Sequence, residues 1–293
     1  MDMIHQVKIT HPEKILLLNS GITKQVIADY YKAISRPLLN YSTGRPLSYK
    51  RYIHGFPGQS FFQRNKPKYA PEWIISESLG INKKAEYIIP DNIETFLWLV
   101  NQESLEFHTA QTKRPDFMQP DMLVFDLDPP YKNGDSLNKY FKMIRDLAIK
   151  IKPLIESFGY NAFPKTSGKK GVHIFCPVVP ENSFDEVFEA AKEIGEEIVN
   201  RLGNVTLRIS REKRTDKTLI DIYRNHTLQS MSLPYGMRAT DKANVSMPLT
   251  WEMLEKTESP EEYNINTVPR IIKNIGDAWK DISEYKVQLH TKK

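Results

Sequence analysis

Hydrophobic positions along the chain follow two patterns, one with the spacing of helices and one with the spacing of strands. After Thr23, which can act as a cap, apolar and aromatic residues recur every three or four positions and predict a helix over 24–36. Asp91 and Ser183 each precede a glutamate by three positions, which is the spacing of a capping box. The predicted helices are 24–36, 92–102, 136–157 and 184–202, with a short one after Thr250.

Short apolar runs bounded by turn residues lie between these helices and predict strands. The runs are 105–109, 121–128, 160–164, 171–178, 205–210 and 218–223. Strands that alternate with helices favour an α/β or α+β core. The first 75 residues are rich in proline and look irregular. We therefore expect one catalytic unit, 1–293, in which a basic segment 1–75 wraps a catalytic core formed by 76–293.

Length and composition exclude several classes of protein. The 293 residues are 40% hydrophobic, which is enough to bury a substantial core. No stretch approaches the roughly 18 consecutive apolar residues of a membrane span, and the N-terminus lacks the apolar core of a signal peptide. Cys176 is the sole cysteine, which excludes an intramolecular disulfide and disfavours a thiolate zinc site. These features predict a soluble protein of a reducing, intracellular compartment.

Charge is distributed unevenly along the chain. The net charge is +5, but residues 1–75 carry +7 and residues 205–245 carry +4, whereas residues 76–204 carry −5. Basic stretches with interleaved aromatic residues favour a polyanionic partner such as nucleic acid. Ordinary solvated faces are the alternative that charge alone leaves open.

The segment MLVFDLDPP at 122–130 carries the clearest chemical signal. Asp126 and Asp128 end an apolar strand at positions i and i+2, so both carboxylates point the same way. Two like charges side by side are unfavourable unless a cation lies between them, and hard oxygen ligands suit magnesium or manganese. A water-exposed acidic pair at the start of a loop is the alternative.

Asp221 is a lone carboxylate within the apolar run 218–223, where burial without a partner would be costly. It can supply a third metal ligand, because two-metal phosphoryl transfer needs carboxylates that bridge both ions. A buried salt bridge to Arg208 or Arg224 is the alternative.

A polar, glycine-punctuated turn at 165–173 offers groups that suit phosphate. Ser167, Lys170 and His173, together with backbone amides near Gly168 and Gly171, can cradle phosphate oxygens. The spacing is not that of a Walker loop, and a basic turn alone is common. His108 lies on a predicted strand, where a lone histidine is more often structural than functional.

Three motifs in this order resemble a known family. DLDP at 126–129, TSGKKGVH at 166–173 and LIDIYRN at 219–225 are similar to the motifs of the archaeo-eukaryotic primase superfamily. The match is closest to the polymerase module of the prokaryotic end-joining ligase D, and it extends from THPEK at 10–14 to TVPRI at 267–271. The resemblance implies a primase-like α/β core of β-sheets flanked by helices.

The resemblance also implies roles for individual residues. Asp126, Asp128 and Asp221 would bind two divalent ions, manganese or magnesium. The nucleotide would be held by Ser167, Lys170, His173 and Arg238, with His108 against it and Arg224 supporting the site near Asp221. Phe61 and Phe62 match aromatic residues that lie against the template, and Lys14 and Lys24 match lysines that grip a downstream 5′-phosphate.

Two positions depart from the family pattern. Lys169 stands where the family usually has a second glycine of the turn, and Ala110 replaces a tryptophan two residues after the histidine. These departures put the geometry of the turn and the wall beside His108 in question. Since the sequence begins at Met1, without a ligase or nuclease module, we expect a stand-alone polymerase.

The implied activity is nucleotide addition, with ribonucleotides preferred, to primer 3′ ends during non-homologous end joining. The implied partners are DNA ends and gapped duplex with a 5′-phosphate, NTPs or dNTPs, Ku and an end-joining DNA ligase, without a membrane, in a prokaryotic cytoplasm near the nucleoid. One alternative is a replicative primase small subunit, which usually carries a zinc-binding Cys/His cluster. The other is a non-catalytic DNA-end binding module, against which the three carboxylates argue.

Overall fold

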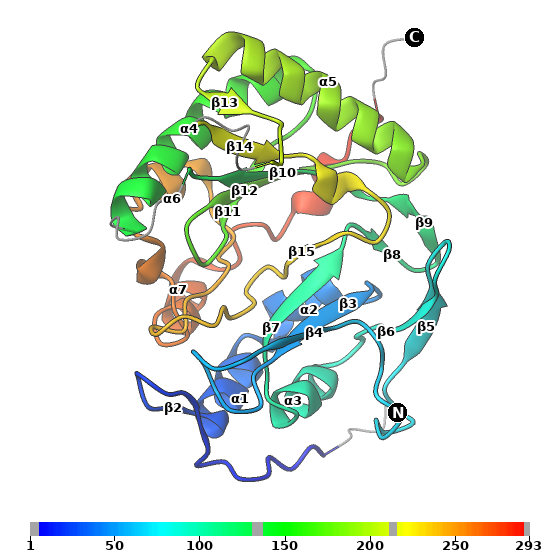
Figure 1. Cartoon of the computed structure of the whole chain (residues 1–293), viewed down its shortest axis with the longest axis vertical. Coiled ribbons are helices and arrows are strands. Elements are labelled where there is room, and N and C mark those ends of the chain that lie inside the picture. Colours follow the sequence, from blue (N-terminus) through cyan, green and yellow to red (C-terminus); the bar gives the residue numbers. More distant parts are fainter. Residues whose placement is uncertain (1–5, 131–136, 211–215, 290–293) are drawn as a thin grey trace.

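The strands form two main sheets that lie one above the other in Figure 1. The structure is a computed structural model and describes residues 6–130, 137–210 and 216–289. The upper, five-stranded sheet has the order β11-β12-β10-β14-β13. Its strands are β10 (Met122–Asp128), β11 (Phe163–Thr166), β12 (Val172–Pro177), β13 (Val205–Thr206) and β14 (Thr218–Asp221). β10 pairs antiparallel with both β12 and β14, so the predicted acidic strand is the central one.

The lower, six-stranded sheet has the order β15-β7-β3-β6-β5, with β4 paired to β3. Its strands are β3 (Leu47–Arg51), β4 (Phe61–Gln63), β5 (Ser76–Leu79), β6 (Ala85–Ile88), β7 (Ser104–Ala110) and β15 (Ser230–Ser232). Two small hairpins stand apart, β1 (Ile15–Leu17) with β2 (Ile22–Thr23), and β8 (Thr112–Lys113) with β9 (Asp116–Pro120).

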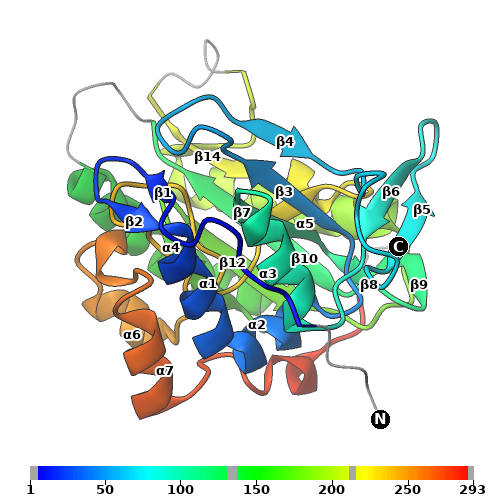
Figure 2. The ribbon, with the colours of Figure 1, turned by 90° about the horizontal axis from the view of Figure 1, so that it is seen from below.

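Helices cover the outer face of each sheet, which leaves the space between the sheets for the site. α4 (Leu137–Ser157) and α5 (Phe184–Leu202) pack on the five-stranded sheet. Seen from below in Figure 2, α1 (Lys24–Ala33), α2 (Ser35–Ser42) and α3 (Ile93–Asn101) lie under the six-stranded sheet. α6 (Trp251–Lys256) and α7 (Val268–Ile275) lie to one side. None of the described helices is long and apolar enough to cross a membrane.

The helix signals in the sequence act largely as predicted. The Ser183 hydroxyl accepts from the Glu186 amide and the Glu186 carboxylate accepts in return, which completes the capping box of α5. Thr250 caps α6 as predicted. The prediction for α3 was wrong by one residue, because the side chain of Asn92 rather than Asp91 accepts the hydrogen bond from the Thr95 amide.

The predicted fold class, a mixed core of β-sheets flanked by helices, is confirmed. Segment 1–75 contains more regular structure than its prolines led us to expect, since it supplies α1, α2, β3 and β4. β3 even lies inside the six-stranded sheet, between β7 and β6. The assignment of this segment as a wrapping, DNA-end-binding part stays an interpretation.

A buried ion pair joins the two sheets. Arg45, just before β3, donates two hydrogen bonds of 2.6 Å each to the carboxylate of Asp121, just before β10. The side chains are only 10% and 2% exposed. Burial would raise the pKa of the Asp121 carboxyl, but the Arg45 guanidinium holds it below its usual value.

Candidate active site

Three carboxylates gather where the central strand of the five-stranded sheet ends. Asp126 lies directly opposite Asp221 on β14 and opposite His173 on β12. Residues that face each other across antiparallel strands project on the same side of the sheet, and so do residues two apart along one strand. Asp126, Asp128 and Asp221 therefore project from one face, as the sequence spacing predicted for the first two.

Positive groups contact these carboxylates. Arg224, on the 3-10 helix η2 (Tyr223–Asn225), places Nε 3.1 Å from Asp221 Oδ2 and 3.6 Å from Asp126 Oδ2. The Tyr223 amide donates to Asp221 Oδ1 at 2.9 Å, and His173 Nε2 lies 3.2 Å from Asp126 Oδ1. The salt bridge from Asp221 to Arg224, stated above as an alternative to metal binding, is thus present.

The environment of Asp126 keeps its carboxyl ionised. Burial would raise its pKa, but the hydrogen bond from His173 and the charges of Arg224 and Lys165 lower it. Burial and the neighbouring Lys165 lower the pKa of His173 to about 4, despite the opposite effect of Asp126. The His173 imidazole is therefore neutral near neutral pH and serves Asp126 as a hydrogen-bond donor.

The donor set of three carboxylates has the chemistry that divalent ions such as magnesium prefer. Among the residues that the structure describes, however, no three His, Cys, Asp or Glu side chains lie close enough together to hold a metal ion. Arg224 lies between Asp126 and Asp221 and supplies the local positive charge.

The turn between β11 and β12 is closed by the hydroxyl of Ser167. Its Oγ accepts hydrogen bonds from the amides of Lys169 and Gly171, at 3.1 and 3.0 Å. Gly168 has a φ of +73°, and a Cβ there would lie 2.5 Å from Cγ of Arg238, so this position requires glycine. Lys169 is not among the residues with positive φ, which explains why the turn accepts lysine where the family usually has glycine.

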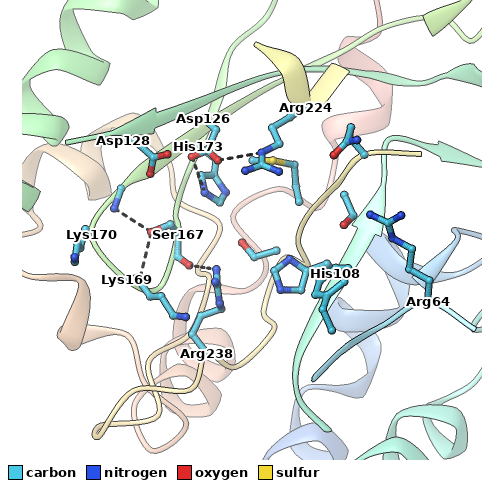
Figure 3. A pocket seen from close by; sticks show the side chains of 16 residues that line it. Arg64, His108, Asp126, Asp128, Ser167, Lys169, Lys170, His173, Arg224 and Arg238 are labelled. Atoms are coloured by element: carbon cyan, nitrogen blue, oxygen red, sulfur yellow. Dashed lines mark hydrogen bonds and ion pairs between the residues drawn. The ribbon is translucent and has the colours of Figure 1, made fainter. Parts of the chain in front are cut away.

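A pocket of about 500 Å³ lies in front of these groups, between the two sheets. Figure 3 shows Asp126, Asp128 and His173 on one side and His108 with Arg64 on the other. The predicted residues that line it are Phe62, His108, Asp126, Asp128, Ser167, Lys170, His173, Arg224 and Arg238. Asp221 is not in this lining and lies opposite Asp126 on the neighbouring strand. The excess of lysine and arginine over carboxylate in this lining suits a polyanionic ligand.

His108 and Phe62 form an aromatic wall of the pocket. Their rings meet edge to face with centroids 5.7 Å apart, and Phe62 is 49% exposed. Burial lowers the pKa of His108 to about 4, although Glu106 acts in the opposite direction. Phe61 lies outside this pocket because neighbouring residues of a strand face opposite sides. Ala110, the second departure from the family pattern, lines a separate small cavity instead.

Lys14 and Lys24 lie near each other but away from the pocket lining. Lys14 forms an ion pair with Glu103 and donates to the carbonyl of Ile53 at 3.1 Å. The Lys24 ammonium donates to the carbonyls of Thr10 and Asn101, at 2.9 and 3.3 Å. Burial lowers the pKa of Lys24 against the opposite effect of Glu103. Lys24 is only 2% exposed, so of the two lysines Lys14 is the more accessible.

Sequence reasoning missed two buried ionisable residues that support the pocket. Glu106 on β7 is 1% exposed and binds Arg238 and Lys169, each at 2.9 Å. Lys165 on β11 is fully buried and donates to the hydroxyls of Ser232 and Ser246. Glu106 precedes His108 by two residues and therefore faces the same side of β7, which was a signal available in the sequence.

Known proteins are similar to this chain in sequence and fold. A family model described as LigD, primase-polymerase domain matches residues 23–279. The chain is 31% identical over 283 residues to the bifunctional non-homologous end joining protein LigD of Bacillus subtilis, covering 94% of this chain and 44% of that protein. It is 28% identical over 262 residues to the multifunctional LigD of Mycolicibacterium smegmatis, covering 88% and 34%. The chain thus spans less than half the length of these curated relatives.

A solved structure agrees over nearly the whole chain. The polymerase domain of Mycobacterium tuberculosis ligase D, in complex with DNA, matches with a TM-score of 0.85 and 26% identity, covering 96% of this chain and 99% of that one. Together with the family match over residues 23–279 and the presence of residues from all three motifs in one pocket, this similarity shows that the chain belongs to the LigD primase-polymerase domain family.

Proposed function

We propose that this chain adds nucleotides to the 3′ end of a DNA primer, filling gaps and extending broken ends, with ribonucleotides preferred over deoxynucleotides. The observation that carries the proposal is that Asp126 and Asp128 line a pocket that is otherwise basic, with Asp221 directly opposite Asp126 on the neighbouring strand. A nucleoside triphosphate with its divalent ions has the charge distribution that complements such a site.

Asp126, Asp128 and Asp221 are the residues that would hold two divalent ions, magnesium or manganese. Bound there, the ions would supply charge neutralisation at the α-phosphate and the pyrophosphate and lower the pKa of the primer 3′-hydroxyl. Arg224 contacts two of the three carboxylates, and we propose that it keeps them oriented and limits their mutual repulsion.

The turn 167–171 and Arg238 would hold the triphosphate. Because Ser167 Oγ accepts from two amides, its own hydrogen can be donated to a phosphate oxygen. Arg238 donates from Nη1 to the carbonyl of Ser167 at 2.8 Å, which places its guanidinium beside the turn. Lys170 and His173 also line this pocket and would lie beside the triphosphate. Catalysis of this kind rests on positioning and charge, without a nucleophilic side chain.

His108 and Phe62 would contact the sugar and base of the incoming nucleotide and the template base opposite it. Aromatic faces stack on any base, at about 1–3 kcal/mol per base. A groove of about 540 Å³ beside the pocket shares Phe62 and Arg64 and is also lined by Lys83 and Lys84. We propose that this groove receives the template strand.

DNA binding is proposed from the basic surface and from the related polymerase domain, which was solved in complex with DNA. Lys14, with Lys24 behind it, would recognise the 5′-phosphate at the far side of a gap. Glu103 is paired with Lys14 in this structure, so a phosphate would have to replace that carboxylate. Ku and an end-joining DNA ligase are the partner proteins proposed, in keeping with the end-joining names of the relatives.

Primer extension on gapped DNA tests the proposal. The substrate carries a 5′-phosphate across the gap, and ATP competes with dATP opposite a template thymine, in magnesium, in manganese and with a chelator. We expect metal-dependent addition with ATP favoured. No extension with either metal would contradict the polymerase, and a dATP preference would contradict the sugar selectivity. Synthesis of dinucleotides on bare single strands would instead favour the replicative primase alternative.

A further inference from the structure

One buried carboxylate, Glu106, binds pocket-lining side chains from both sheets. Glu106 Oε2 accepts from Arg238 Nε at 2.9 Å, and Oε1 accepts from Lys169 Nζ at 2.9 Å. The Tyr52 hydroxyl donates to Oε1 at 3.0 Å, and His108 Nε2 lies 3.6 Å from Oε2. The Glu106 side chain is only 2% exposed, so these contacts are made away from solvent.

These donors come from separate parts of the fold. Glu106 and His108 lie on β7 of the six-stranded sheet, whereas Lys169 lies in the turn between two strands of the other sheet. Arg238 follows β15 and also binds the carbonyl of Ser167 in that turn. His108, Lys169 and Arg238 all line the pocket (Figure 3), so Glu106 holds three pocket groups from behind.

Charge explains why the carboxylate is needed there. Lys169 and Arg238 contact the same carboxylate and repel each other, and the proximity of Arg238 adds to burial in lowering the pKa of Lys169. Burial would raise the pKa of Glu106, but Arg238, His108 and Lys169 hold it well below its usual range. Because one carboxylate, Glu106, pairs with two cations, Lys169 and Arg238 keep a net positive charge that can bind an anionic ligand in the pocket.

We propose that Glu106 is a positioning residue that fixes Lys169 and Arg238 as a paired cationic clamp for the nucleotide triphosphate. Lys169 is thereby a triphosphate-binding residue in addition to Lys170, at a position where the family usually has glycine. This inference rests on the proposed polymerase function. It predicts that this chain binds nucleoside triphosphates more tightly than a variant with the family's glycine at that position.

The test compares Glu106→Gln and Lys169→Gly with the unmodified chain. Glu106→Gln keeps the size of the side chain and removes its charge, and Lys169→Gly restores the family pattern. Steady-state primer extension gives KM for ATP and kcat separately. ATP affinity is also measured by fluorescence on a primer ended with a dideoxynucleotide, so that no chemistry occurs. The control is Glu77→Gln on β5 of the same sheet as Glu106, which breaks an exposed 2.7 Å ion pair to Arg114.

We expect each variant to raise KM for ATP by about tenfold or more, the effect of one charge-assisted hydrogen bond, with a smaller change in kcat. DNA affinity and the control should match the unmodified chain. The double variant Glu106→Gln/Lys169→Gly should be little worse than Glu106→Gln alone, because both changes dismantle one clamp.

Unchanged KM for Lys169→Gly, or effects of the two variants that simply add, would overturn the proposal. If Glu106→Gln fails to fold, Lys169→Gly and Lys169→Met decide the matter alone, since Lys169 is 37% exposed. Failure of the unmodified chain to extend any primer would contradict the proposed function instead. Normal extension with an unaltered KM in the variants would contradict only the clamp.

Discussion

The Arg45–Asp121 ion pair gives the most direct prediction about how the two sheets are held around the pocket. Asp121→Asn removes the negative charge and leaves the Arg45 guanidinium, 10% exposed, without its counter-ion. Removing one partner of a buried pair typically destabilises a protein by about 3–5 kcal/mol. The bidentate geometry, with both distances at 2.6 Å, supports a value within that range.

This loss of unfolding free energy corresponds to a measurable drop in the melting temperature. Unfolding entropy of about 2.1 cal/mol/K per residue, over 293 residues, turns a loss of about 3 kcal/mol into a drop of roughly 5 °C. The matched control is Glu77→Gln, which breaks the exposed pair to Arg114 and should cost less than about 1 kcal/mol. Differential scanning calorimetry or circular dichroism of the three proteins provides the comparison.

The effect should also depend on pH. The pKa of Asp121 is lowered in the folded protein, so its pairing stabilises the fold above the unfolded-state pKa of about 3.9 and is lost as pH falls through the folded value. The difference in unfolding free energy between the unmodified chain and Asp121→Asn should therefore be constant near neutral pH and become smaller in acid. A variant no less stable than the Glu77→Gln control would refute the reasoning.

Three further predictions concern the site. Glu103→Gln should release Lys14 and raise affinity for gapped DNA with a 5′-phosphate several-fold, whereas Lys14→Gln should abolish the preference for phosphorylated over unphosphorylated DNA. Fluorescence anisotropy measures these affinities, and unchanged affinities in the two variants would contradict the phosphate pocket. Gly168→Ala, at a φ of +73° and against Arg238, should cost about 1–2 kcal/mol in stability and raise KM for ATP, and wild-type values would contradict the required turn. Phe62→Ala should weaken template binding more than Phe61→Ala, measured by the same anisotropy, and equal losses would contradict their opposite facing.

The sequence allowed the chemistry-bearing strands to be predicted because their patterns are local. An apolar run ending in Asp126 and Asp128 predicts both the strand and the shared face of its carboxylates. The capping box at Ser183 likewise needs only residues three positions apart. Asp91 and Asn92 are both good caps, and the choice of Asn92 depends on packing that a local pattern does not contain.

The six-stranded sheet was harder to predict because its strands are short and partly polar. β5 reads SESL and lacks the alternation of a half-buried strand, whereas β3 reads LSYKR and alternates Leu47 and Tyr49 with polar residues over only five positions. So short a pattern is a weak signal by itself, and β3 is stabilised by pairing with strands on both sides.

The supporting charges of the site depend on contacts that are distant in sequence. Glu106 and Lys169 are 63 positions apart, and Glu106 and Arg238 are 132 apart. Their meeting depends on how the two sheets face each other, which no local spacing encodes. The presence of lysine in place of a second glycine could be noticed in the sequence, but its partner could not.

The proposed polymerase activity depends most on whether the three carboxylates on β10 and β14 form a reaction centre. Asp221→Asn is the sharpest variant, since Asp221 also pairs with Arg224 and could be purely structural. We predict that this variant binds gapped DNA like the unmodified chain but loses nucleotide addition by several orders of magnitude in single-turnover primer extension, because one carboxylate ligand is gone. Near-normal extension by a folded Asp221→Asn protein would contradict the account.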